Sequence, residues 1–230
     1  MRTTIVHTST STPPVSFRRP LRRERRAHGG LTRFVAPLAL AGGLALVSFP
    51  APAGADVVEI TTAKDNTLIQ DNYVYLSLGA GPYMFAGRVG PNGEGLRRRA
   101  LMHFDIDAAV PAGSTIESVT LRLWMAGTSS GNQTVSLRRL TSDWGEGPSF
   151  AYGGLGAPAT PGDATWAHTY YPNEMWGSLG GDFVDTVSAS RTVGGVNYYT
   201  WGSTPEMVAD VQAWLDGTVP NFGWVLMGNE

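Results

Sequence analysis

The stretch IESVTLRLWMA, residues 116–126, alternates between apolar and polar side chains. This period of two is that of a β-strand with one buried face. Such a strand must pair with neighbours and must cover its apolar face with a second layer, so it predicts a layered β-protein. The apolar face carries Val119, Leu121, Leu123 and Met125, and Trp124 lies on the other face.

Glycine and proline, with 29 and 15 residues, recur along the chain and divide it into short apolar segments. Short strands bounded by turn residues are typical of all-β proteins. PAGS, residues 111–114, predicts a turn between the fourth and fifth strands. We predict strands over Val57–Thr62, Thr67–Gln70, Tyr83–Val89, Ala100–Ile106, Ile116–Ala126, Thr134–Leu140, Val196–Trp201 and Phe222–Met227.

The fourth of these strands, ALMHFDI, also alternates, which predicts one inward and one outward face. We expect Ala100, Met102, Phe104 and Ile106 to point inward, and Leu101, His103 and Asp105 to point outward.

One helix is predicted, over TPEMVADVQAWLDG, residues 204–217. Thr204 is a preferred N-cap residue, Pro205 occupies the favoured first helical position, and Gly217 supplies the C-cap. A short helix in a strand-rich chain is expected to cover a sheet edge or a barrel end. The residues at helical spacing on its apolar stripe are Met207, Val208, Val211, Trp214 and Leu215.

These elements together predict an all-β fold: an antiparallel, two-sheet β-sandwich, jelly-roll-like, with one short accessory helix. A closed barrel is the alternative. The stretch from Ser142 to Thr192 is glycine-rich with scattered aromatic residues. A long loop of this kind in a compact domain often carries function.

Residues 1–55 differ in kind from the rest of the chain. They hold eight of the 17 basic residues and one acidic residue, Glu24. An arginine-rich start is followed by the apolar run FVAPLALAGGLALVSF, residues 34–49. This order is that of a secretory signal peptide with a long basic n-region.

Small residues at the end of this segment, Ala53 and Ala55, predict cleavage before Asp56. An uncleaved membrane anchor is one alternative, and a twin-arginine export signal at Arg18-Arg19 is another. The predicted location is secreted, either extracellular or at the cell surface, with no stable membrane insertion once the signal is removed.

Residues 56–230 are predicted to form a single β-sandwich domain, because about 175 residues suffice for one substantial core. This part has nine basic and 18 acidic residues, a net charge of −9. An acidic surface argues against nucleic acid as a partner. The chain has no cysteine, which excludes thiol nucleophiles, zinc fingers and iron–sulfur clusters.

A series of strings resembles the DNRLRE-domain family of secreted bacterial proteins over residues 61–230. The strings, in order, are KDNTLIQD, GPYMFAGRVG, RRALMHFDIDAAVPAGSTIESVTLRLWM, SDWGEG, GDATW, GGDF, MVADVQAWLDG and NFGWVLMGNE. The string that names the family is absent, and DNTLIQ at 65–70 stands closest to it. The resemblance implies a β-sandwich similar to carbohydrate-binding modules. It also implies a further strand beyond GNE, without which a sheet edge is left unpaired.

Aromatic residues are the strongest ligand-binding candidates, because flat rings stack on sugar faces. We expect Trp214 and Trp224 in the core. The alternative for the remaining rings is that they plug the open end of the sandwich and hold the long loop down by burial. The candidates for a binding platform are Trp144, Trp166, Tyr170, Tyr171 and Trp176.

SDWGEGPSF, residues 142–150, brings Asp143 and Glu146 close together. A glycosidase needs two carboxylates ~5 to 9 Å apart. The flanking glycines favour a turn instead, in which carboxylates accept hydrogen bonds from the backbone. His103 in a strand and His168 in a loop have no nucleophile elbow to serve. We therefore predict no catalytic residue.

A structural calcium ion is the one cofactor that the sequence suggests. Calcium takes six to eight oxygen ligands, often from loop Asp and Asn side chains. The weak candidates are Asp65, Asn66 and Asp71, with Asn72, and they lack EF-hand spacing.

The sequence favours a secreted, non-catalytic β-sandwich module that binds polysaccharide or a cell-surface glycan. The alternative is a structural or adhesive surface module without glycan binding, and a polysaccharide lyase or hydrolase is less favoured. Exposure of Trp144, Trp166 and Trp176 separates the first two. Exposed rings on one surface favour binding, and buried rings favour a scaffold.

Overall fold

The structure is a computed structural model, and it describes residues 3–9, 56–72, 75–89 and 96–230, with the backbone alone for 3–9. The helices are α1 (Ile106–Ala109) and α2 (Pro205–Leu215). The strands are β1 (Thr3–Ser9), β2 (Asp56–Thr61), β3 (Lys64–Ile69), β4 (Leu76–Ser77), β5 (Gly87–Arg88), β6 (Arg97–His103), β7 (Thr115–Met125), β8 (Gln133–Arg139), β9 (Ala157–Pro158), β10 (His168–Tyr170), β11 (Glu174–Met175), β12 (Ala189–Val193), β13 (Asn197–Trp201) and β14 (Trp224–Met227).

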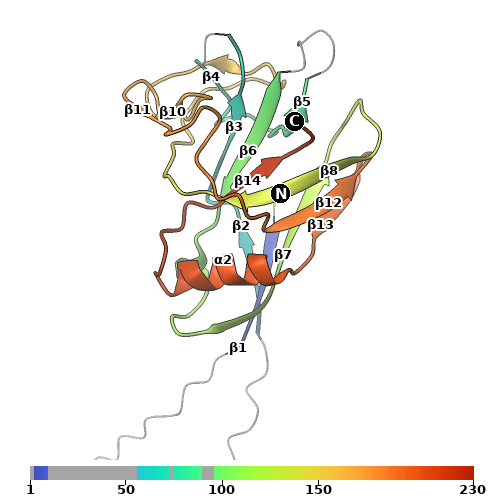
Figure 1. Ribbon diagram of the computed structural model, residues 1–230, viewed down its shortest axis with the longest axis vertical. Helices are drawn as coiled ribbons and strands as arrows, with labels where there is room; N and C mark the ends of the chain where they lie inside the picture. The colour runs from blue at the N-terminus through green and yellow to red at the C-terminus, as the bar shows by residue number, and fades with distance from the viewer. Residues whose placement is uncertain (1–2, 10–55, 73–74, 90–95) are drawn as a thin grey trace, which may run out of the picture. The chain divides into compact units, whose positions relative to one another are not determined.

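Two antiparallel sheets form the body of the protein (Figure 1). The first has the strand order β13-β7-β1-β2. The second has the order β12-β8-β14-β6-β3, with β5 also paired to β6. This arrangement confirms the predicted all-β, antiparallel sandwich. Two smaller ribbons, β4-β9 and β10-β11, belong to the loop region at one end of the second sheet.

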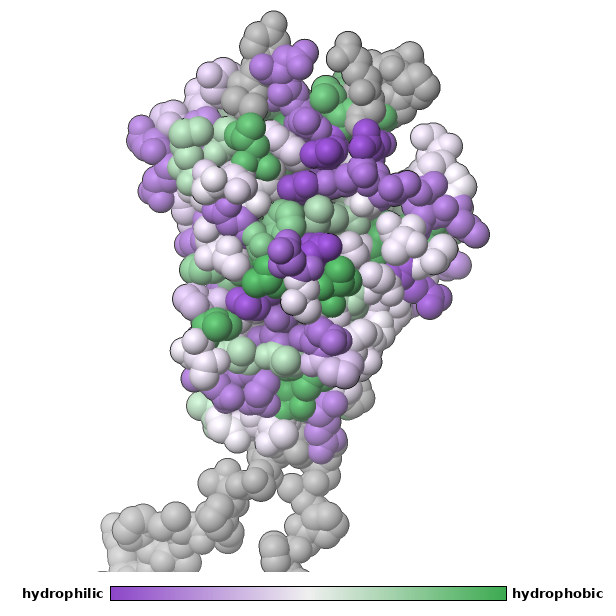
Figure 2. Space-filling view, in the orientation of Figure 1, coloured by the Kyte–Doolittle hydropathy of each residue, from purple (hydrophilic) through white to green (hydrophobic). Residues whose placement is uncertain are grey.

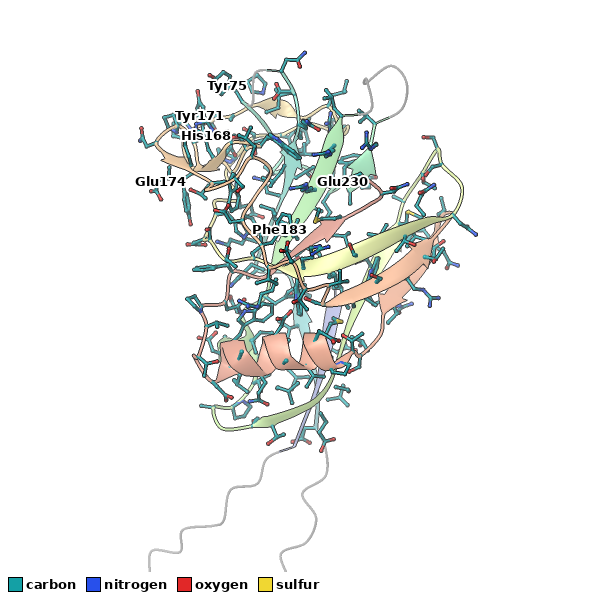
Figure 3. All side chains as sticks on the ribbon, viewed as in Figure 1. Tyr75, His168, Tyr171, Glu174, Phe183 and Glu230 are labelled. Carbon is teal, nitrogen blue, oxygen red and sulfur yellow. The ribbon has the colours of Figure 1, made fainter. Side chains whose placement is uncertain are left out.

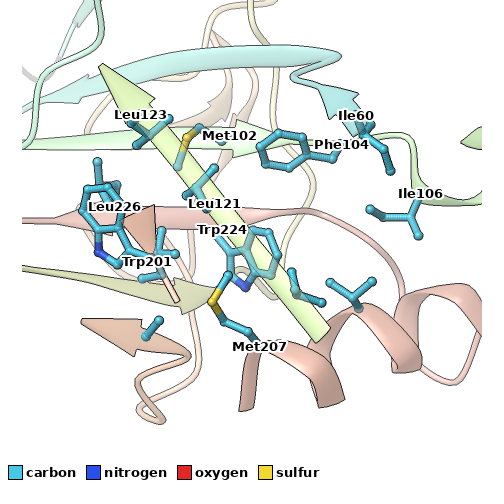
Figure 4. Packing of buried hydrophobic residues seen from close by; sticks show 14 of the residues in the cluster. Ile60, Met102, Phe104, Ile106, Leu121, Leu123, Trp201, Met207, Trp224 and Leu226 are labelled. Atoms are coloured by element: carbon cyan, nitrogen blue, oxygen red, sulfur yellow. The ribbon is translucent and has the colours of Figure 1, made fainter. Parts of the chain in front are cut away.

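The main core lies between the two sheets and beneath α2 (Figure 4). β7 contributes Val119 and Leu121, which are fully buried as their alternation predicts. Trp201 from β13 and Trp224 from β14 fill the centre, and Trp224 meets Phe104 edge to face, with ring centroids 6.0 Å apart. Rings packed in this way bury a large apolar area.

A second core covers the opposite face of the second sheet. Leu101 of β6, Val225 of β14 and Leu68 of β3 are each fully buried there. Leu101 lies on the face opposite Ala100 and Met102, as expected, but this second face is buried as well. Both faces of β6 are buried, because the long loop forms a third layer over the sheet.

Helix α2 begins and ends as predicted. The Thr204 side chain accepts a hydrogen bond from the Met207 backbone N–H, and Pro205 stands in the first turn. Gly217 follows the helix with φ of +64°, a conformation that favours glycine. Met207, Val211 and Trp214 on its inner face are buried in the main core.

Three other elements differ from the predictions. β6 ends at His103, and Ile106 begins the one-turn helix α1 rather than ending a strand. Only Gly87–Arg88 of the segment 83–89 forms a strand. Within the predicted loop, Ala189–Val193 pairs with β8 as β12.

The strand β1 comes from the segment predicted to be a signal peptide. Its backbone pairs with β2 on one side and with β7 on the other. Residues 10–55, with the apolar run and the proposed cleavage site, lie outside the described residues, so the signal remains a prediction. None of the described helices is long and apolar enough to cross a membrane.

Candidate functional site

The SDWGEG turn leaves β8 and packs against the start of β3. Asp143 accepts hydrogen bonds from Lys64 at 2.7 Å, from the Tyr170 hydroxyl at 2.7 Å and from the Trp144 backbone N–H at 2.8 Å. Burial raises the pKa of Asp143, but these hydrogen bonds outweigh burial and hold the pKa below its ordinary value. The carboxylate is therefore ionised and bound on several sides.

Glu146 has a similar structural role. Its carboxylate accepts a hydrogen bond from the Asp65 backbone N–H at 3.1 Å. Its backbone carbonyl accepts one from the Asn66 side chain at 2.7 Å. Asp143 and Glu146 thus fasten the turn to β3, which is the turn chemistry that the flanking glycines favour.

The calcium candidates lie on β3 and just after it. Asn66 is fully buried, and its Oδ1 accepts hydrogen bonds from the backbone N–H groups of Thr67 and Leu78 at 2.6 and 3.1 Å. Its Nδ2 donates to Ser77 and to Glu146. Protein groups therefore use both ends of the amide. Within the described ranges, no cluster of three His, Asp or Glu residues is arranged to hold a metal ion, and the calcium site stays a prediction.

The three candidate tryptophans lie in the interior. Trp144, Trp166 and Trp176 are 0%, 4% and 6% exposed. They pack with Leu101, Leu140 and other residues in the core between the second sheet and the long loop. The sequence left two roles open for these rings, a binding platform and a plug for the open end of the sandwich. Their buried position matches the plug.

Polar contacts fix these indole rings. Trp144 Nε1 donates to the Phe222 carbonyl, and Trp176 Nε1 donates to the Thr165 carbonyl, each at 2.9 Å. The Arg99 guanidinium carbon lies 4.9 Å from the centre of the Trp166 ring. The indole N–H groups of Trp144 and Trp176 are thus satisfied, as buried indoles require.

Arg99 also ties the loop to the end of the described chain. It donates to the Gly180 carbonyl at 2.7 Å and pairs with Glu230 at 2.6 Å. Its guanidinium carbon also lies 5.2 Å from the centre of the Phe183 ring. The loop layer is therefore held by charge as well as by apolar packing.

Three other rings meet at the outer end of the loop region: Tyr75, His168 and Tyr171, here called the aromatic corner (Figure 3). The centroid of Tyr171 lies 6.1 Å from that of Tyr75 and 5.1 Å from that of His168. The Tyr75 and Tyr171 planes are inclined by 64°. Tyr75 is 51% exposed, whereas His168 is buried. The rings therefore form an open angle rather than a flat platform.

Short backbone pairings position the corner. The Tyr75 carbonyl accepts a hydrogen bond from Ala159 at 2.7 Å, just before β4 pairs with β9. The Tyr171 backbone N–H donates to the Asp163 carbonyl at 2.8 Å. Thr165 Oγ1 lies 2.9 Å from His168 Nδ1 and fixes that ring. Each ring is thus anchored through its own backbone or side chain.

Polar groups flank the corner. Tyr170 points its hydroxyl to Asp143 and is paired in the β10-β11 ribbon with Glu174. Burial, together with Asp143 and Glu174, raises the pKa of Tyr170, so its hydroxyl stays protonated. Burial lowers the pKa of His168, which keeps its imidazole neutral at neutral pH. The β10-β11 ribbon that carries His168 thus also carries Tyr170 and the exposed carboxylate of Glu174.

Of the sequence candidates, the corner includes Tyr171, and Tyr170 stands beside it. Sequence reasoning missed Tyr75 and treated His168 as loop material without a defined role. Tyr75 follows no motif, and it reaches the corner through the pairing of β4 with β9, which lie about 80 residues apart. No local pattern could reveal that pairing.

Two further surface features lie elsewhere. Trp124 and Tyr198, about half exposed, pair across β7 and β13 with ring centroids 4.8 Å apart.

A cleft of about 430 Å³ beside the end of α2 is lined by His103, Asp105 and Trp214, among others. Burial and then Lys64 lower the pKa of His103.

The comparisons with known proteins add no assignment: no family model, curated protein or solved structure matches the chain. The resemblance to the DNRLRE-domain family therefore stays a prediction.

Proposed function

We propose that the chain is a non-catalytic module of the DNRLRE type that binds polysaccharide or a cell-surface glycan at the aromatic corner. It acts outside the cell after its leader is removed. The observation that carries the proposal is the exposed ring of Tyr75 beside the anchored rings of His168 and Tyr171. Tyr75 is about half exposed, and His168 beside it is buried and lies within hydrogen-bond distance of Thr165.

A sugar ring fits this arrangement chemically. Its C–H face stacks on the Tyr75 ring, and its hydroxyl groups form hydrogen bonds with polar groups at the rim such as Glu174. The Tyr75 carbonyl and the Tyr171 backbone N–H are both hydrogen-bonded, so these backbone groups need little further ordering on binding. Figure 2 shows apolar and polar residues interspersed over the face in view.

The non-catalytic assignment is supported by the two carboxylates of the SDWGEG turn. A glycosidase acid needs a carboxyl group whose pKa is raised. The pKa of Asp143 is instead lowered, and its carboxylate accepts from the side chains of Lys64 and Tyr170 and from the Trp144 backbone N–H, while the Glu146 carboxylate accepts from the Asp65 backbone N–H. These contacts favour a structural role over a lyase or hydrolase.

Affinity electrophoresis against a panel of polysaccharides tests the proposal. Retardation by at least one neutral polysaccharide is expected. Tyr75→Ala should reduce the retardation at least several-fold, whereas Tyr75→Phe, which keeps the ring, should retain most of it. Tyr198→Ala, which removes a similarly exposed ring from β13, is the matched control. Absence of retardation across the panel would refute glycan binding.

A second candidate function is a structural or adhesive surface module. The burial of Trp144, Trp166 and Trp176 favours it, because these rings stabilise the loop layer rather than face a ligand. Its signature is a folded, stable domain that no polysaccharide retards. The same panel therefore separates the two candidates.

A further inference from the structure

The cleft beside the end of α2 is separate from the aromatic corner and from the SDWGEG turn. Its volume of about 430 Å³ lies within the range of small-molecule sites. It is formed where the end of β6 and helix α1 meet the residues that follow α2. No residue of the aromatic corner is among the described residues that line it. The cleft is therefore a candidate site of its own.

The side chains that line the cleft give it a negative charge. Asp105 and Asp107 both line it, and none of the described lining residues is lysine or arginine. Asp105 is the N-cap residue of α1, yet its carboxylate makes no capping hydrogen bond. This carboxylate lies 3.6 Å from His103 Nδ1. Burial, followed by Lys64, lowers the pKa of His103, so its imidazole is neutral at neutral pH and offers no positive charge.

The C-terminal end of α2 adds to this negative potential. Trp214 in its last turn and Gly217 just beyond it both line the cleft. The free C=O groups at a helix C-terminus carry a partial negative charge, which a basic side chain commonly balances. The last turn of α2 has no basic residue, and its C-cap is Asp216. The electrostatic potential in the cleft therefore favours a positively charged ligand.

Trp214 also lacks a partner for its indole N–H. The residue is 5% exposed, and its Nε1 is buried with no hydrogen-bond partner among the described residues. By contrast, the buried indoles of Trp144, Trp176 and Trp224 each donate to an oxygen atom. A buried N–H without an acceptor is costly, so a ligand that brings an acceptor oxygen to this side chain gains affinity.

We propose that this cleft binds an amino sugar, a ring that carries an ammonium group beside hydroxyl groups. The carboxylates of Asp105 and Asp107 hold the ammonium group, and a hydroxyl oxygen accepts from Trp214 Nε1. Val219 and Pro220 in the cleft wall contact C–H groups of the ring. An organic cation fits better than a metal ion, because no three His, Asp or Glu side chains of the described residues are arranged to hold a metal.

NMR titration of the isotope-labelled full chain at pH 7 tests the proposal. The ligands are D-glucosamine, D-glucose, which has hydroxyl groups without the charge, and cyclohexylamine, which has the charge without hydroxyl groups. D-Glucosamine should bind at least about fivefold more tightly than either, because it alone serves both the carboxylates and the indole N–H. The indole signal of Trp214, identified by its absence from Trp214→Phe, should shift in a saturable manner.

Variants locate the two contacts. Asp105→Asn and Asp107→Asn should each weaken D-glucosamine binding about two- to fivefold, and the double variant should bind it no more tightly than D-glucose. Trp214→Phe should weaken binding about two- to tenfold. Glu206→Gln removes one negative charge from the exposed first turn of α2, at the other end of the helix, and is the matched control. It should change the affinity less than about 1.5-fold, because salt screens distant charges.

Three results would overturn the proposal. In the first, D-glucosamine and D-glucose bind with equal affinity. In the second, the Asp105, Asp107 double variant binds D-glucosamine as tightly as the wild-type protein. In the third, cyclohexylamine binds as tightly as D-glucosamine, which would show a plain ammonium site. Tyr75→Ala should leave D-glucosamine binding unchanged, and the double variant should leave retardation by neutral polysaccharides unchanged, so failure of the cleft and failure of the corner are distinguishable.

Discussion

Asn66 joins three parts of the loop region to β3. Its buried amide accepts from the Leu78 backbone and donates to Ser77 and to the Glu146 carbonyl. The Asp and Asn residues around Asn66 in the sequence suggested a calcium site. The structure instead shows an amide whose partners are protein groups, which come from segments as far as 98 residues away.

Replacing Asn66 by alanine should lower the free energy of unfolding by about 2–4 kcal/mol, because several buried backbone groups lose their partners. Urea denaturation measures the change. Asn197→Ala, at an exposed position where the side chain accepts only from the adjacent Tyr198 N–H, is the matched control and should cost less than about 0.5 kcal/mol. Equal effects of the two substitutions would contradict the role of Asn66.

The stability of the domain should fall between pH 8 and pH 5.5. Burial lowers the folded-state pKa of both His103 and His168 below 6.5. The unfolded chain therefore binds more protons as pH falls through 6.5, which favours unfolding. Urea midpoints measured across this range should decrease with pH, and the double variant His103→Asn, His168→Asn should flatten the decrease. An unchanged slope in the double variant would show that other groups cause it.

At the scale of elements, structure that depends on contacts between residues near in sequence could be predicted. Structure that depends on contacts between distant segments could not. β7 and α2 were predictable because their periodicity and caps are local. The second buried face of β6 was not, since Leu101 is covered by a loop that joins it only in the folded chain. β12 was not predicted, because its three central residues are exposed and polar or charged, a pattern that is typical of a loop. The aromatic corner depends on the β4-β9 and β10-β11 ribbons, each two or three residues long.

The loop layer should depend on its buried tryptophans. Trp166→Ala removes a ring that is 4% exposed and stacked near Arg99. Such a change in a core typically costs about 3–5 kcal/mol. Limited proteolysis should then cut within residues 145–181 before the sheets unfold. Trp124→Ala, at a half-exposed ring, should leave the cleavage pattern unchanged; cleavage of both variants at the same rate would argue against the plug.

At the scale of the whole molecule, the net charge of −9 over residues 56–230 bears on ligand choice. Like charges repel at long range, and salt screens them with a Debye length of about 8 Å at physiological ionic strength. Neutral polysaccharides should therefore bind more tightly than polyuronates of similar linkage. Raising the salt concentration should reduce the difference in affinity between neutral polysaccharides and polyuronates. Tighter binding of the polyuronate at low salt would contradict this expectation.

The most direct test of the account is isothermal titration calorimetry with an oligosaccharide cut from the most strongly retarding polysaccharide. The affinities of the wild-type protein, Tyr75→Ala and Tyr198→Ala are compared under conditions in which all three proteins are equally folded. Loss of a stacked ring should weaken binding by about 1–3 kcal/mol, or roughly fivefold to more than a hundredfold. We expect this loss for Tyr75→Ala and unchanged affinity for Tyr198→Ala. Equal affinity of all three proteins would contradict a glycan site at the aromatic corner.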